Sequence, residues 1–259
     1  MGILFRLLLV LVVFTSCAAA EEVRLLSYNV RHGVDFAGKP ALERQAKILK
    51  ESGASLIALQ EIDKVCRRSG GVDQTARFAE LTESQGKFGA FMDYDGGRYG
   101  LAMLSRLAIK DSSVVRLPDG REPRVALVLD VETERGNRLL VANVHFDWTS
   151  EKLRIPQAAA LLAHLKDRDL PAVVLGDYNA RPGSPTLKLF TDAGFRFAEK
   201  PNDARFTFNA QRPTVEIDHI AVRDGGGLRL TAKSISVLPE AEASDHRPIA
   251  ATIVLGPAE

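Results

Sequence analysis

Strand-like and helix-like segments follow one another irregularly along this chain, and this irregular order constrains the fold most. Short apolar runs of strand length recur from Val23 to Leu255. Five such runs follow each other directly within 88–144, and turn sequences such as Asp95-Gly96-Gly97 separate several of them. A parallel sheet needs a helical crossover between consecutive strands, so the order predicts mixed sheets. Two sheets packed face to face, with helices outside, accommodate it.

Helical spacing occurs in the segments that separate the remaining runs. The expected helices, two of them with a serine or aspartate at the N-cap, cover 41–52, 74–84, 151–166 and 184–194. The chain has 259 residues, of which 46% are hydrophobic and 26% charged. This composition supports a full core and argues against disorder. We see no internal repeat and no low-complexity linker.

The first twenty residues have the layout of a secretory signal. The segment 1–6 carries one positive charge, the run Leu7–Phe14 is apolar throughout, and Ala18-Ala19-Ala20 supplies small residues before Glu21. The run is far shorter than the roughly 20 apolar residues that span a bilayer. We therefore predict a signal peptide at 1–20, one domain at 21–259, and an exported protein, periplasmic or extracellular.

Cys17 leaves a second processing route open. The sequence Phe14-Thr15-Ser16-Cys17 resembles a bacterial lipoprotein cleavage site, although Phe14 replaces the usual aliphatic residue. Cleavage after Ala20 is favoured, and a lipoprotein anchored through Cys17 is the alternative. Cleavage after Ala20 leaves Cys66 alone, so no disulfide framework supports the fold.

The charge balance bears on the class of partner. The chain has 34 Lys and Arg against 33 Asp and Glu, and Arg6 is the one charged residue of the predicted leader. A neutral domain has no general attraction to a polyanion, although a local basic patch would be enough to bind a polyanion. The sequence therefore favours a small-molecule or lipid-headgroup substrate over nucleic acid, and it gives no basis for inferring a partner protein.

Polar residues recur at or beside the ends of the predicted strands, and this feature points to a site. Asp177 and Asn179 are two apart, so both would face one side of an extended segment. Each motif alone is equally compatible with a simple turn. Six such motifs occur in all: Ser27-Tyr28-Asn29, Leu59-Gln60-Glu61, Asn143-Val144-His145, Gly176-Asp177-Tyr178-Asn179, Ile217-Asp218-His219 and Ser244-Asp245-His246.

The side chains in these motifs favour a hard cation. Carboxylate and amide oxygens are the ligands of Mg²⁺, whereas zinc sites use clustered cysteines or closely spaced histidines, and this sequence has neither. We therefore expect Mg²⁺, with Mn²⁺ or Ca²⁺ as substitutes. The oxygen donors are Asn29, Glu61, Asp177, Asn179 and Asp245.

In their order along the chain, these motifs resemble the series of the DNase-I-like endonuclease/exonuclease/phosphatase superfamily. Gly97-Arg98-Tyr99-Gly100 and Leu104-Ser105-Arg106 belong to the same series. The resemblance extends from Val23 to Leu255, and the ordered set is far more specific than any single motif. It implies an α/β fold of the α+β kind: a four-layer sandwich of two packed, mostly antiparallel or mixed sheets flanked by helices.

The resemblance also implies residue roles. His246 would be the general base for the attacking water, oriented by Asp218, and Asp177 would position the water or share the metal. Asn179 and His145 would bind the scissile phosphate. The implied metal ligands are Glu61, Asn29, Asp177 and Asp245, and the implied substrate contacts are Asn179, His145, Arg98 and Tyr99.

Two positions depart from the series or are ambiguous. Val144 stands before His145 where relatives often carry a small hydroxyl residue, and Asp73 is the candidate carboxylate to support His145. His219 would face away from Asp218 on an extended strand, so it belongs either to the site edge or to the core.

The expected activity is metal-dependent hydrolysis of a phosphodiester or phosphomonoester by in-line attack of water. A secreted nuclease acting on DNA or RNA is the alternative. A second, less favoured alternative is a non-catalytic module that binds a phosphate ligand.

Overall fold

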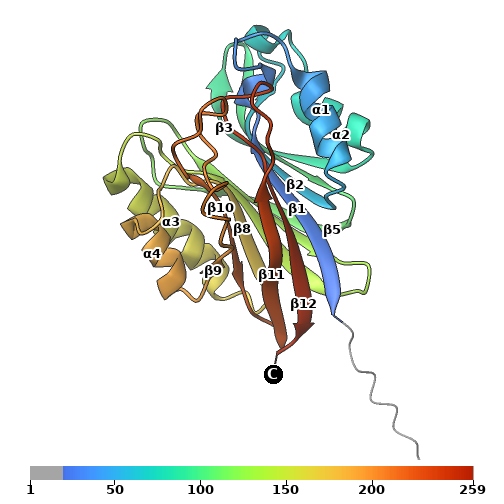
Figure 1. Cartoon of the computed structure of the whole chain (residues 1–259), viewed down its shortest axis with the longest axis vertical. Helices are drawn as coiled ribbons and strands as arrows, with labels where there is room; N and C mark the ends of the chain where they lie inside the picture. Colours follow the sequence, from blue (N-terminus) through green and yellow to red (C-terminus); the bar gives the residue numbers. More distant parts are fainter. Residues whose placement is uncertain (1–19, 259) are drawn as a thin grey trace, which may run out of the picture.

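The computed structural model describes residues 20–258, so the predicted signal peptide, with Cys17, lies outside the described residues except for Ala20. Two six-stranded sheets make up most of this part of the chain (Figure 1). The first sheet has the order β11 (Leu228–Val237), β12 (Ile249–Pro257), β1 (Glu21–Asn29), β2 (Leu56–Lys64), β4 (Gly97–Ser105) and β3 (Gln85–Tyr94). The second has the order β5 (Ala108–Arg116), β6 (Val125–Glu132), β7 (Arg138–His145), β8 (Ala172–Asp177), β10 (Asp218–Arg223) and β9 (Arg196–Phe197).

Both sheets are mixed. The pairs β1–β2 and β7–β8 are parallel, and the other strand pairs are antiparallel. Each parallel pair is joined by a crossover that contains a helix, as a parallel connection requires. Where five strands follow one another, three of the connections join antiparallel neighbours, and the connection from β4 to β5 passes from the first sheet to the second. The irregular order of predicted elements therefore arises because each sheet combines parallel and antiparallel strand pairs.

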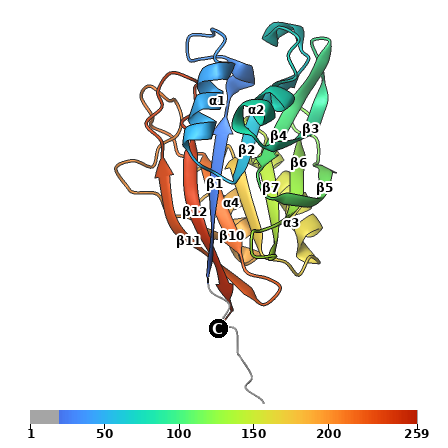
Figure 2. The ribbon, with the colours of Figure 1, turned by 90° about the vertical axis from the view of Figure 1, so that its right-hand side faces the viewer.

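Four helices cover the outer faces of the two sheets in the described part of the chain. Helices α1 (Leu42–Glu51) and α2 (Gln74–Thr82) cover the first sheet, and α3 (Glu151–Lys166) and α4 (Pro185–Asp192) cover the second. Figures 1 and 2 show the two helix pairs on opposite sides of the molecule. The four-layer sandwich predicted from the sequence is therefore confirmed.

Strand residues alternate between two apolar environments. On β1, Leu25 faces the core between the sheets, whereas Leu26 and Tyr28 face the layer beneath α1 and α2. Because both faces of the central strands are covered, these strands contain continuous apolar runs, such as 172–175 on β8. In the described residues, no helix is long and apolar enough for a membrane crossing.

Most of the element boundaries follow from local sequence. Asp73 and Ser150 cap α2 and α3 by accepting the N–H groups of Ala76 and Lys152 at 3.1 and 3.2 Å. Helix α2 ends two residues earlier than expected because Glu83 takes a left-handed backbone with φ of 55°. The two-residue strand β9 was not predicted, since it has no periodicity to detect.

The topology brings the predicted site residues to one end of the sandwich. In the second sheet, Asp177 pairs in register with His145 of β7 on one side and Asp218 of β10 on the other. Directly paired residues project their side chains from the same face of the sheet, so these three form a row. In the first sheet, Asn29 ends β1 beside Gln60 of β2.

Candidate active site

Asp177 lies at the centre of the site. Its Oδ2 oxygen is 3.2 Å from Asn29 Nδ2, 3.5 Å from His145 Nε2 and 3.6 Å from His246 Nε2. The Asp177 side chain is almost completely buried. One carboxylate oxygen therefore faces groups from both sheets and from the segment that precedes β12.

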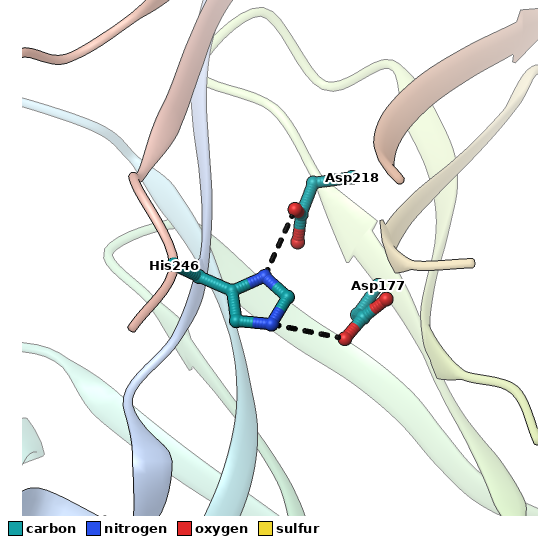
Figure 3. Close-up of side chains that lie close together, drawn as sticks. All are labelled: Asp177, Asp218 and His246. Atoms are coloured by element: carbon teal, nitrogen blue, oxygen red, sulfur yellow. Dashed lines mark hydrogen bonds and ion pairs between the residues drawn. The ribbon is translucent and has the colours of Figure 1, made fainter. Parts of the chain in front are cut away.

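His246 is held between two carboxylates. Its Nδ1 is 3.0 Å from Asp218 Oδ2, and its Nε2 points toward Asp177 (Figure 3). The imidazole also lies against the ring of Phe208, with ring centroids 4.9 Å apart. In the neutral ring with Nδ1 donating to Asp218, Nε2 is left as the acceptor that faces the pocket. The predicted pairing of His246 with Asp218 is therefore present in the structure.

Glu61 reaches the site from a distortion in β2. The pairing with β4 jumps from Leu59↔Ala102 to Ile62↔Gly100, and Glu61 in the resulting bulge has φ of 60°. A left-handed backbone costs about 1 to 2 kcal/mol for a residue with a side chain. Bulges of this kind redirect a side chain next to an active site. Here the bulge places Glu61 Oε1 3.0 Å from Asn29 Nδ2.

The segment after β8 is a turn rather than the extended strand that we expected. Asp177 Oδ1 accepts the backbone N–H of Asn179 at 2.9 Å, and Asn179 has φ of 50°. Its side-chain amide donates to the carbonyl of Phe146 at 3.1 Å. The prediction of two side chains on one face of an extended segment was wrong, since an aspartate accepts readily from the N–H two residues on. Both residues still line the same pocket.

Burial and mutual charge set the ionisation of this cluster. Burial raises the pKa of Asp177 to about 7, and the neighbouring Asp218 adds to the rise. Burial lowers the pKa of His246, but the charges of Asp218 and Asp177 outweigh it and raise that pKa to about 10. Burial also raises the pKa of Glu61, yet contacts with His32, His145 and Asn29 hold it below its ordinary range.

The cluster opens into a pocket of about 430 Å³ at the end of the sandwich. Tyr99, expected to be a substrate contact, lines it, and its side chain is nearly buried. Asp245 also lines it, with Oδ2 3.5 Å from Arg31 Nε. The remaining wall is formed by Glu61, Glu122, Arg124, His145, Trp148, Asp177, Asn179, Phe208, Ile217 and His246.

Three residues singled out in the sequence are not brought to this pocket. Arg98 is exposed and its guanidinium lies 5.9 Å from the ring centroid of Phe88, because alternation along β4 turns it away from the side of Tyr99. His219 is buried on the opposite side of β10, where Nε2 contacts the carbonyl of Ala180 at 2.8 Å. Asp73 caps α2 and pairs with Lys64 at 3.3 Å, so its expected support of His145 was wrong.

The residues fit a hard cation. Glu61 and Asp177 both lie within 3.2 Å of the same Asn29 nitrogen, so the two carboxylates face one small volume. Asn29 presents nitrogen to them, because its Oδ1 accepts the N–H of Arg31 at 3.1 Å. As oriented, Asn29 bridges the carboxylates as a donor, and an amide flip would present its oxygen. A second grouping, Asp177, Asp218 and His246, has ligand atoms within 4.8 Å of one another.

Sequence reasoning missed four residues of the pocket wall: Glu122, Arg124, Trp148 and Phe208. Arg124 directly precedes β6, at the start of a strand rather than at an end, and no motif marks it. Trp148 lies in the loop after β7 and is 59% exposed at the mouth of the pocket. Trp148 follows His145 by three positions, and this closeness to a motif is the one feature of the sequence that could have indicated a role.

A model of the endonuclease/exonuclease/phosphatase family matches residues 26–246. The chain belongs to this family. Members of the superfamily are hydrolases that act on phosphoesters. The matched segment contains all ten predicted site residues, from Asn29 to His246.

Several solved structures share the fold. A conserved protein from Enterococcus faecalis V583 is 23% identical, with a TM-score of 0.74 over 89% of this chain and 99% of that one. A mannosyl-6-phosphatase from Bacteroides thetaiotaomicron is 19% identical, with a TM-score of 0.74 over 89% and 99%. The catalytic domain of human nocturnin, solved with a bound sulfate anion, is 19% identical, with a TM-score of 0.71 over 90% and 94%. At these identities the likeness shows the fold alone.

Proposed function

We propose that this protein is a divalent-metal-dependent phosphoesterase that hydrolyses its substrate by in-line attack of water. The observation that carries the proposal is the position of His246, whose Nδ1 is held by Asp218 while Nε2 faces Asp177. A histidine oriented by a buried carboxylate is suited to remove a proton from water. Family membership supports the same reaction class.

The proposed metal ligands are Glu61 and Asp177, with Asn29 beside them and Asp245 at the mouth. A Mg²⁺ ion held there would offset the phosphate charge and counteract the carboxylates that raise the pKa of His246. Mn²⁺ or Ca²⁺ would be substitutes for it.

The residues of the chain complete the reaction. His246 accepts the proton of the attacking water at Nε2, and Asp218 holds the ring in that orientation. Burial holds the pKa of His145 well below its ordinary value, so the ring is neutral and one nitrogen can donate to a phosphate oxygen. The exposed ring of Trp148 offers the rest of the substrate a stacking surface at the mouth.

A small or lipid-headgroup phosphoester fits this site better than nucleic acid. The chain has nearly equal numbers of basic and acidic residues, so it lacks the general attraction to a polyanion. Arg31 and Arg68, which lie beside the pocket residues Asp245 and Tyr99, are each paired with a carboxylate, that of Asp245 and that of Asp63. We therefore propose a small or lipid-headgroup phosphoester as the substrate, and hydrolysis of DNA or RNA is the alternative that the assay below includes.

A metal-dependence assay on a substrate panel tests the proposal. The chain from Glu21 would be assayed with an aryl phosphomonoester, an aryl phosphodiester, sugar phosphates, sphingomyelin and plasmid DNA. We expect turnover of a small phosphoester that disappears after treatment with EDTA and returns with Mg²⁺ or Mn²⁺. Undiminished turnover by the metal-stripped protein would contradict the metal role. Plasmid nicking alone, weakening steeply with salt, would instead establish a nuclease.

We also propose that the protein is exported with cleavage after Ala20. The first described strand supports this position, because β1 begins at Glu21, whose carboxylate accepts from Thr133, Arg135 and Asn137. Mass spectrometry of the protein expressed in a bacterial host is expected to show an N-terminus at Glu21 in the periplasmic or culture fraction. A diacylglyceryl cysteine at position 17, or an intact leader in the cytoplasm, would contradict it.

A further inference from the structure

Arg124 is a buried cation with an incomplete set of partners. It is 1% exposed and is among the largest fully buried side chains in the described residues. Its Nη2 lies 3.0 Å from Glu122 Oε2, but its Nε and Nη1 have no hydrogen-bond partner within residues 20–258. Guanidinium donors buried without acceptors are costly, so such an arrangement calls for an anion.

The surroundings of Arg124 fix its guanidinium against the pocket. The ring of Phe91 lies 4.7 Å from the guanidinium carbon and covers one of its faces, while Glu122 holds one edge. Arg124 lines the same pocket as Tyr99 and His145. Its positive charge is one of the causes that lower the pKa of His145, second only to burial. Arg124 therefore acts on the same small volume as the proposed phosphate-binding histidine.

His145 adds a further unpartnered polar atom. Its Nδ1 is buried and has no hydrogen-bond partner in the described part of the chain, as for Arg124 Nε and Nη1. His145, Tyr99 and Arg124 are each less than a tenth exposed. The wall that they form is therefore closed, and an ester chain could not continue through it. The open side of the pocket lies at Trp148, which is 59% exposed.

We infer that Arg124 binds terminal oxygens of a phosphomonoester, with Nε and Nη1 directed at the phosphate and Glu122 positioning the other edge. This inference rests on the proposed function and narrows it to a substrate class. A guanidinium matches two phosphate oxygens in a planar pair of hydrogen bonds, which a lysine cannot reproduce. A terminal phosphate fits against the closed wall of Tyr99, Arg124 and His145, and the group esterified to it then extends toward Trp148.

The test compares Arg124→Gln and Arg124→Lys with Arg116→Gln, a matched control on the exposed strand β5. We expect Arg124→Gln to lower kcat/KM for an aryl phosphomonoester about 100-fold and for the matching diester less than about tenfold. Arg124→Lys should keep the charge but recover only part of the loss, and Arg116→Gln should match the wild type. Equal losses on both substrates, or wild-type preference for the diester, would overturn the inference.

Binding of inorganic phosphate separates this inference from the proposed function. In calorimetry with Mg²⁺ present, phosphate should bind wild type at least about tenfold more tightly than Arg124→Gln. The same difference in phosphate affinity is expected even if no tested ester is hydrolysed. That combination of results would contradict the proposed function but support phosphate binding by Arg124. The ligand-free Arg124→Gln variant should keep its thermal midpoint, because a half-paired buried charge has been removed. A lowered midpoint with unchanged phosphate affinity would show a structural role and overturn the inference.

Discussion

Asp177→Asn is expected to lower kcat on the order of 10³-fold, because it removes the charge around which the whole site is arranged. The substitution keeps the shape of the side chain but turns one oxygen into a donor. Asp177 Oδ2 is within 3.6 Å of nitrogens on Asn29, His145 and His246, so an amide nitrogen at that position would face the donating amide of Asn29 instead of accepting from it. The proposed metal site also loses one of its two facing carboxylates.

Measurement of kcat and of Mg²⁺ affinity by calorimetry distinguishes this loss from misfolding. The thermal midpoint should change little, because Asp218 continues to accompany the charge of His246. Asp192→Asn provides a control, since Asp192 is exposed and forms an ion pair with Lys188 on α4. A folded Asp177→Asn protein with activity within tenfold of wild type would refute the central place given to this carboxylate.

The row of residues in the second sheet was accessible from sequence because it depends on strand pairing. His145 and Asp177 end β7 and β8, and Asp218 begins the antiparallel strand β10, so all three lie at the same edge of the sheet. A single polar side chain at a strand end can belong to a turn, but several such side chains at neighbouring strand ends indicate a functional site. The ordered series of motifs then placed Asn29, Glu61 and His246 with them, although these come from the other sheet and from a loop.

The remaining features depend on contacts that no local pattern encodes. The positive φ values at Glu61 and Asn179 arise from a bulge and a turn, which the chain tolerates because neighbouring strands hold them in place. Arg124 carries no mark in the sequence, since an arginine before a strand is ordinarily a solvated charge. Its burial follows from Phe91 on the opposite sheet, which is 33 positions earlier in the chain.

His246→Ala is expected to lower kcat by about 10² to 10⁴-fold, the range of a lost general base. Asp218→Asn should also lower kcat, because Asp218 acts through the ring of His246 at 3.0 Å. The double variant should then be no slower than His246→Ala alone, within about threefold, since a positioning residue has nothing left to orient. His164→Gln, on α3, is the control for loss of an imidazole outside the pocket.

The Asp218→Asn and His246→Ala substitutions also decide whether Asp218 binds the metal or orients His246. Its carboxylate lies in a group with Asp177 and His246 that is itself compact enough for a cation. If Asp218 held the metal, Asp218→Asn would weaken Mg²⁺ binding in the His246→Ala background, and the losses in kcat would multiply. If Asp218 orients the base, Mg²⁺ affinity stays the same in that background and the losses do not multiply. We expect the second result, because the short contact of Asp218 is to the Nδ1 nitrogen of the ring, which leaves Nε2 free to face the pocket.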